Sequence, residues 1–221
     1  MAEPVKRRYR SEARAAAAAE TRRRIREAAT ELFVEQGYAA TSLREVAARA
    51  GVGERTLYDA FPSKVALFSH ALDVATVGDE EEVAVAERDE IQDAIADPDP
   101  HRAMRSYLSY CVGLLERAGP LIMVVQAAAD ADDQMRAMND AGRDATVRLH
   151  QRFAGALMER GSLAPGLDDA TAADLLYALT SPHVHQLLRT DRGWTAEQYT
   201  AWLEATAVDQ VLGGAPTDPS T

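Results

Sequence analysis

The chain has 221 residues, a formal net charge of −11, 47% hydrophobic residues and a single cysteine, Cys111. This composition favours a globular protein rich in helix, so we expect an all-α fold. One cysteine excludes an intrachain disulfide and a cysteine-cluster metal site, and it fits a reducing cytoplasm. The longest apolar run, residues 121–125, is far shorter than the about 20 residues of a membrane span.

The N-terminal region predicts an arm followed by a helix. Residues 1–20 are basic and low in complexity, so we expect a flexible arm whose distal half can extend the first helix. Apolar residues recur at intervals of three and four over residues 21–36. Gly37 is expected to end this helix, because glycine readily adopts the left-handed conformation found after a helix.

Two short helices follow in the arrangement of a helix-turn-helix. Ser42 and Glu45 have the spacing of a capping box, which opens a helix over residues 43–50 that Gly51 ends. A third helix is expected over residues 54–61. These segments predict a compact three-helix unit over residues 21–64.

The remaining residues predict a larger helical domain over 65–213 and a polar tail over 214–221. An acidic connector is expected over residues 78–86, Gly119–Pro120 is expected to interrupt a helix, and Pro182 is expected to kink another. The helices of this domain are expected over 64–77, a short stretch ending at 97, 101–118, 121–129, 132–160, 168–189 and 196–212.

Charge is divided unevenly between these regions. Residues 1–64 hold 13 Lys and Arg against 9 Asp and Glu, whereas the rest holds 11 against 26. Because charges are screened over about 8 Å at physiological salt, an acidic body hardly cancels a basic surface that touches phosphate. The sequence therefore allows the first region to bind an anionic partner despite the net charge.

The third helix has the side chains expected of a helix that enters the major groove of DNA. On a helical wheel Leu57 faces the core, whereas Arg55 and Thr56 face outward. Arginine can pair with guanine, and the threonine methyl can touch thymine. Asp59 can accept from cytosine or hold Arg55 in place, and we favour the second. The alternative for this region is an ordinary three-helix bundle with charged faces.

Eight residues around the third helix and the two neighbouring helix starts are expected to contact bases or phosphates, because free N–H groups at a helix start also favour an anion. They are Thr41, Ser42, Arg44, Arg55, Thr56, Tyr58, Asp59 and Lys64.

The stretch LFVEQGYAATSLREVAARAGVGERTLYDAFPSKVALF, residues 32–68, closely resembles the N-terminal DNA-binding domain of the tetracycline-repressor (TetR) family. The resemblance extends over residues 21–68. It implies a dimeric transcriptional regulator, usually a repressor, whose C-terminal body binds a small molecule and then releases palindromic operator DNA. It also implies base or phosphate contacts for Thr56, Tyr58 and Lys64. Gly53 and Asp59–Ala60 depart from the family pattern, which bears on the operator sequence rather than on the fold.

The body is matched by architecture alone, so its site residues come from apolar patterns. One stripe on the middle helices is expected to line an effector pocket for a small organic compound, with plain core as the alternative: Met104, Tyr107, Leu108, Cys111, Met123 and Gln126. The last two long helices are more apolar than surface helices need, and the resemblance places the dimer interface there. The interface residues are expected to be Leu175, Leu176, Leu179, Val184, Leu187, Leu188, Trp202 and Leu203.

No pattern in the sequence indicates an enzyme, a cofactor or a metal site. His183 and His185 point in diverging directions on a helix, and no other ligand completes a zinc set. The resemblance therefore predicts a cytoplasmic ligand-responsive regulator that is not an enzyme. The alternative is a protein that sequesters a small molecule or a partner protein and has lost operator recognition; an activator is also open.

Overall fold

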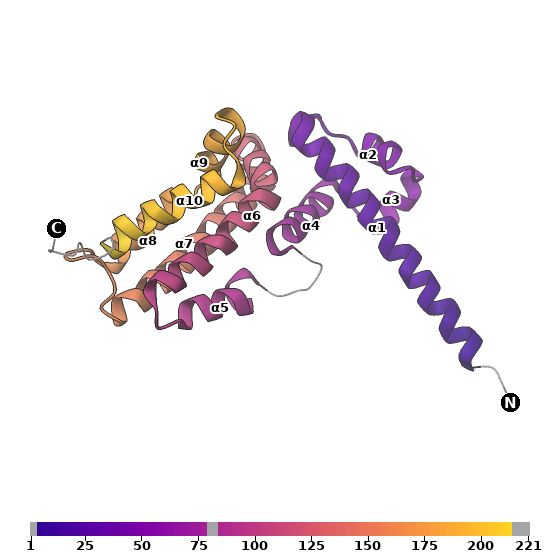
Figure 1. The fold of residues 1–221 in the computed structure, drawn as a ribbon. Coiled ribbons are helices and arrows are strands. Elements are labelled where there is room, and N and C mark those ends of the chain that lie inside the picture. Colours follow the sequence, from indigo (N-terminus) through magenta and orange to yellow (C-terminus); the bar gives the residue numbers. More distant parts are fainter. Residues whose placement is uncertain (1–3, 79–83, 214–221) are drawn as a thin grey trace. The chain divides into compact units, whose positions relative to one another are not determined.

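The computed structural model describes residues 4–78 and 84–213, with side chains from Arg14 onward, and the described residues contain helices and no strands (Figure 1). The predicted all-α fold is confirmed. The acidic run 79–82 and the tail 214–221 lie outside the described residues. The helices are α1 (Pro4–Ala40), α2 (Leu43–Ala50), α3 (Glu54–Ala60), α4 (Lys64–Val77), η1 (Val85–Glu87), α5 (Asp89–Ala96), α6 (Pro100–Ala128), α7 (Asp133–Glu159), α8 (Asp169–Leu179), α9 (Pro182–Gln186), η2 (Leu187–Asp191), α10 (Ala196–Ala207) and η3 (Val208–Leu212).

The chain divides into two compact units, Met1–Asp73 and Val74–Thr221. The division falls inside α4, later than the boundary predicted after residue 64. One continuous helix therefore contributes its first residues, from Lys64, to the first unit and its last turn to the second.

Helix α1 begins at Pro4, which corrects the flexible arm predicted for residues 1–20 over the part that is described. The alanine run 15–19 has the highest intrinsic helix propensity, and Arg23 pairs with Glu20 and Glu27, each at 2.7 Å, along the same face. Gly37 leaves the helical conformation with φ 82°, as the sequence predicts.

Three aromatic rings pack against one another in the first unit. The Phe33 ring lies 4.8 Å from that of Phe68 and 5.8 Å from that of Tyr38, and the Phe68 and Tyr38 rings are 5.5 Å apart. The capping box of Ser42 and Glu45 forms at the start of α2, as predicted. Helix α2 is thus fixed by its cap and by packing on α1, and α3, which has no side-chain cap, is fixed by packing on α2, since helices of this length are marginal alone.

Helix α6 is the centre of the second unit and packs against α5, α7, α9 and α10. It is long and apolar enough to cross a membrane by length and composition, a test that core helices also pass. Its apolar face is buried in the unit, with Tyr107 stacked on Phe153 of α7 at 4.0 Å. Helix α6 is thus a core helix in this structure.

Two predicted helix boundaries in the body are wrong. Helix α6 runs through Gly119–Pro120 without interruption: Pro120 is exposed, and the packing of α6 against α5, α7, α9 and α10 outweighs the helical hydrogen bond that a proline removes. Pro182 does not kink a helix but begins α9, because Ser181 caps it and proline suits the first position of a helix.

A buried histidine joins three helices of the body. His150 of α7 lies 2.6 Å from the Tyr107 hydroxyl through Nδ1 and 3.1 Å from the Thr180 hydroxyl through Nε2. The Thr180 hydroxyl also donates to the Leu176 carbonyl, so Nε2 carries the proton and Tyr107 donates to Nδ1. Burial lowers the pKa of His150 to about 4.

This network predicts a specific loss of stability in acid. Below pH about 6.5, the ordinary histidine pKa, His150 binds a proton in the unfolded chain but stays neutral in the folded chain. The free energy of unfolding therefore falls by about 3 kcal/mol as the pH approaches 4. Urea unfolding at pH 7 and near pH 4 measures this loss. The variant His150→Gln, which cannot titrate, should lose about 3 kcal/mol less than the wild type over that range; equal losses would contradict the assignment.

Candidate nucleic-acid interface

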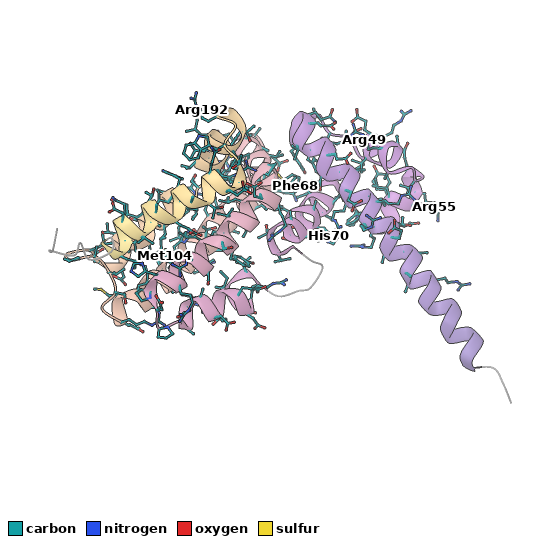
Figure 2. All side chains as sticks on the ribbon, in the orientation of Figure 1. Arg49, Arg55, Phe68, His70, Met104 and Arg192 are labelled. Carbon is teal, nitrogen blue, oxygen red and sulfur yellow. The ribbon has the colours of Figure 1, made fainter. Side chains whose placement is uncertain are left out.

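Helix α3 presents a polar face to solvent and buries the other. Leu57 is fully buried, whereas Arg55, Thr56, Tyr58 and Asp59 are all exposed, and Figure 2 shows Arg55 projecting from the surface of the first unit. Tyr58 is 52% exposed, which is unusual for so large an apolar ring. The structure therefore brings four of the predicted contact residues together on one accessible face.

Two arginines of α1 hold the ends of the short helices. Arg22 donates to the Ala60 carbonyl at 2.8 Å and lies 4.5 Å above the Phe61 ring, at the end of α3. Arg24 donates to the carbonyls of Ala50 and Gly51 at the end of α2. Sequence reasoning missed both roles, although these arginines position the recognition face.

The start of α2 offers a second exposed region. Arg44 is 85% exposed and lies 3.9 Å from Glu54 at the start of α3. The Ser42 hydroxyl accepts from the Glu45 backbone N–H at 3.2 Å and donates to its carboxylate at 2.7 Å. Arg44 is thus available to a phosphate, and Ser42 fixes the helix start beside it.

Thr41 does not belong to this surface, which corrects its prediction as a contact residue. Its side chain is 1% exposed, and its hydroxyl lies 2.8 Å from the Gly37 carbonyl oxygen and 3.2 Å from that of Leu32. The hydroxyl turns inward because the break at Gly37 leaves carbonyls at the end of α1 in need of donors, and that of Gly37 is one of them.

The ammonium group of Lys64, at the start of α4, makes its hydrogen bonds within the first unit. Its Nζ donates to the carbonyls of Tyr38 at 2.8 Å, Thr41 at 3.0 Å and Ala39 at 3.4 Å, and lies 4.4 Å from the centre of the Tyr38 ring. An ammonium group has three N–H donors, and here three carbonyls surround it. The geometry favours a role in fixing α4 to the end of α1 over the predicted phosphate contact.

The predicted pairing of Asp59 with Arg55 is not made, since no ion pair or hydrogen bond joins these two fully described side chains. With the cation four residues before the anion, the order is the less favourable one for a helical pair, and both groups are exposed. Arg55 therefore keeps its donors available.

Comparison with known proteins supports this geometry. Residues 25–71 match the family model described as bacterial regulatory proteins, tetR family. The chain is 26% identical over 185 residues to the HTH-type transcriptional repressor BepR of Brucella suis biovar 1 (strain 1330), a match that covers 81% of this chain and 86% of BepR. Residues 25–71 therefore form a DNA-binding domain of the tetR family of bacterial regulatory proteins. The predicted family and the predicted DNA-binding function are confirmed.

Solved structures show the same fold over nearly the whole chain. NalD, the secondary repressor of the MexAB-OprM multidrug efflux pump in Pseudomonas aeruginosa, has 21% identity and a TM-score of 0.66, covering 89% of this chain and 98% of NalD. The SmeT–triclosan complex has 18% identity and a TM-score of 0.68, covering 91% and 96%. The TetR fold therefore includes the body as well as the matched N-terminal domain.

The body contains a cavity of about 890 Å³ with mixed polar and apolar walls. The end of α4, the segment before α5, and helices α5, α6 and α10 line it. The lining residues are Val77, Gly78, Arg88, Glu90, Asp93, Ala94, Asp97, Arg105, Ser106, Ser109, Tyr110, Gly113, Arg117 and Glu204.

The six residues predicted to line an effector pocket lie elsewhere on α6. Met104, Tyr107, Leu108 and Cys111 are buried in the core, where Figure 2 shows Met104 inside the bundle, and burial raises the pKa of the Cys111 thiol to about 12. Met123 and Gln126 are half-buried. None of the six lines the cavity. The apolar stripe was visible in the sequence, but the polar face that lines the cavity was not singled out.

The predicted dimer residues divide into two groups. Leu176 and Leu203 are fully buried in the core of their own chain, which corrects their assignment to an interface. Leu187 is 52% exposed. The half-buried remainder is Leu175, Leu179, Val184, Leu188 and Trp202.

His185 has a protein partner. Its Nε2 lies 3.0 Å from Glu116, which also binds Arg189 at 2.5 Å, so the carboxylate joins α6 to α9 and η2. Among the described residues no three His, Cys, Asp or Glu side chains lie close enough to hold a metal ion.

Because Lys64 donates to three carbonyls whereas Arg44 is exposed, replacing each by alanine should have different effects on stability and on DNA binding. Lys64→Ala removes three charge-assisted hydrogen bonds, so it should lower the free energy of unfolding by about 2 kcal/mol and leave the salt dependence of DNA binding nearly unchanged. Arg44→Ala, at an exposed position, should keep the stability and lower the salt slope by about one. Urea unfolding and salt-dependent gel shifts measure both, and a lower slope for Lys64→Ala with unchanged stability would restore its phosphate role.

Proposed function

We propose that this protein is a cytoplasmic, dimeric repressor that binds a palindromic operator and leaves it when a small molecule binds the body. The observation that carries the proposal is the exposed face of α3, with Arg55, Thr56 and Tyr58 held outward while α1 fixes the helix end. Such a face fits a major groove, where base edges carry a distinct pattern of donors and acceptors.

The relatives support the repressor role and the effector. BepR and NalD are both named as repressors, and SmeT is described in complex with triclosan. The cavity of the body offers a place for a ligand of comparable chemistry, a small organic molecule. A ligand that binds the two states of the body with about 100-fold different affinity supplies about 2.7 kcal/mol, enough to vacate a moderately occupied operator.

The operator and the role of Arg55 can be tested together. Selection of bound DNA from a random pool should recover a palindrome whose half-sites lie about one helical turn apart. On that site Arg55→Ala should lose about 1–3 kcal/mol relative to the wild type and should lose discrimination at one base pair, because an arginine–guanine pair is removed. Recovery of no preferred sequence at low salt would favour the sequestering alternative.

The dimer is proposed to form through the exposed and half-buried apolar residues around α8, η2 and α10. A dimer of this kind brings two α3 helices to one palindrome. Its centre is expected at Leu187, since an apolar side chain that is 52% exposed gains most from being covered.

Leu187→Asp should therefore convert a dimer to a monomer in sedimentation velocity, because a carboxylate would be buried without a partner. Met158→Asp is the matched control, since Met158 is 47% exposed on α7, outside the proposed interface. If both variants sediment as the wild type does, the interface lies on another face.

A further inference from the structure

One end of the body cavity gathers hydrogen-bond donors. Tyr110 and Arg117 come from α6, and Arg88 immediately precedes α5. The Tyr110 hydroxyl is buried and has no hydrogen-bond partner among the described residues. Arg88, Tyr110 and Arg117 line the same cavity, and the positive charges of the two arginines act to lower the pKa of Tyr110, which burial raises.

The two guanidinium groups favour an anion at Tyr110, although the lining of the whole cavity holds four carboxylates, those of Glu90, Asp93, Asp97 and Glu204, against three arginines, Arg88, Arg105 and Arg117. Glu90 is the one carboxylate among the charged groups that act on Tyr110, against the two guanidinium groups. Asp97 also lines the cavity, and its carboxylate is already bound by Arg102 at 2.5 and 2.6 Å. The buried Tyr110 hydroxyl is a donor that a carboxylate oxygen would satisfy, at a position that costs free energy when it is empty.

Arg117 also holds the end of α4. Its Nε donates to the Ala75 carbonyl at 3.2 Å and its Nη2 to the Thr76 carbonyl at 3.5 Å. Both distances are long compared with the 2.7–2.9 Å that is typical of a guanidinium bound to a carboxylate. Gly78 and Gly113 leave room for the guanidinium, since a Cβ at either position would lie 3.2 Å from one of its nitrogens.

We infer that this cavity binds a small organic acid, with its carboxylate against Tyr110 between Arg88 and Arg117, and that the carboxylate draws Arg117 away from the end of α4. The carboxylate displaces the Ala75 and Thr76 carbonyls from Arg117 because a short charged pair is stronger than two long hydrogen bonds to carbonyls. Helix α4 then loses the donors that satisfy its last carbonyls. Since α4 continues into the DNA-binding unit, loss of this cap lowers operator affinity, a step that rests on the proposed function.

The binding step can be tested without DNA. The probes are a library of small organic acids, each paired with its primary amide, titrated calorimetrically into the full-length protein. At least one acid should bind about tenfold or more tightly than its amide, the difference expected for hydrogen bonds to a charged group. Arg117→Gln and Tyr110→Phe should each reduce that preference, whereas Arg143→Gln, at an exposed position of α7, should retain it.

The coupling step uses the operator recovered by selection. The preferred acid should weaken operator binding by the wild type, and Arg117→Gln should bind the operator more weakly without ligand and respond little to the acid. Absence of binding by every acid, equal binding of acid and amide, or an unchanged preference in both cavity variants would overturn the site. Acid binding that leaves operator affinity unchanged would overturn the coupling. A protein that prefers acids but selects no DNA would refute the proposed function and support the site.

Discussion

Cations from other elements hold the C-termini of the first five helices, and the DNA-binding unit and the end of α4 depend on these contacts. The last carbonyls of a helix have no partner in the helix and carry a partial negative charge. Helices α1, α3, α4 and α5 have no basic residue in their own last turn, so the donor must come from elsewhere. For α1 to α5 in order, the cations at these ends are Lys64, Arg24, Arg22, Arg117 and Arg160, the last donating to the Ile95 carbonyl.

This use of cations changes how the charge of the chain relates to its function. The first 64 residues have four more basic than acidic residues. However, Arg22, Arg24 and Lys64 donate hydrogen bonds to carbonyls at helix ends. Arg49 likewise joins α2 to Glu31 and Glu35 of α1. In the part of the first unit whose side chains are described, Arg44 and Arg55 remain as exposed cations beside the recognition face. Within the described side chains, the recognition face thus offers DNA a few well-placed cations rather than a broad basic surface.

The sequence predicted the elements whose signals are local. The capping box at Ser42, the left-handed glycines and the apolar period located α2 to α4 closely. The sequence did not predict features that depend on contacts between residues far apart in the chain. Arg22 meets the carbonyl of Ala60, 38 residues away, and no periodicity records such a contact. Thr41 turns inward to carbonyls four and nine residues before it, which no apolar pattern records, and no local pattern distinguished Pro120, inside α6, from a proline that ends a helix. The exposed face of α3 was predictable because burial of Leu57 alone orients it.

The two ends of α4 are held with unequal strength: the contacts at its start are stronger than the contacts at its end. At its start Lys64 lies among three carbonyls, two of them within 3.0 Å, and over an aromatic ring. At its end Arg117 is exposed and makes two long hydrogen bonds. A competing anion can displace the second contact at far lower cost than the first. The start of α4 is therefore suited to hold the DNA-binding unit in shape, and its end is suited to respond to what occupies the cavity.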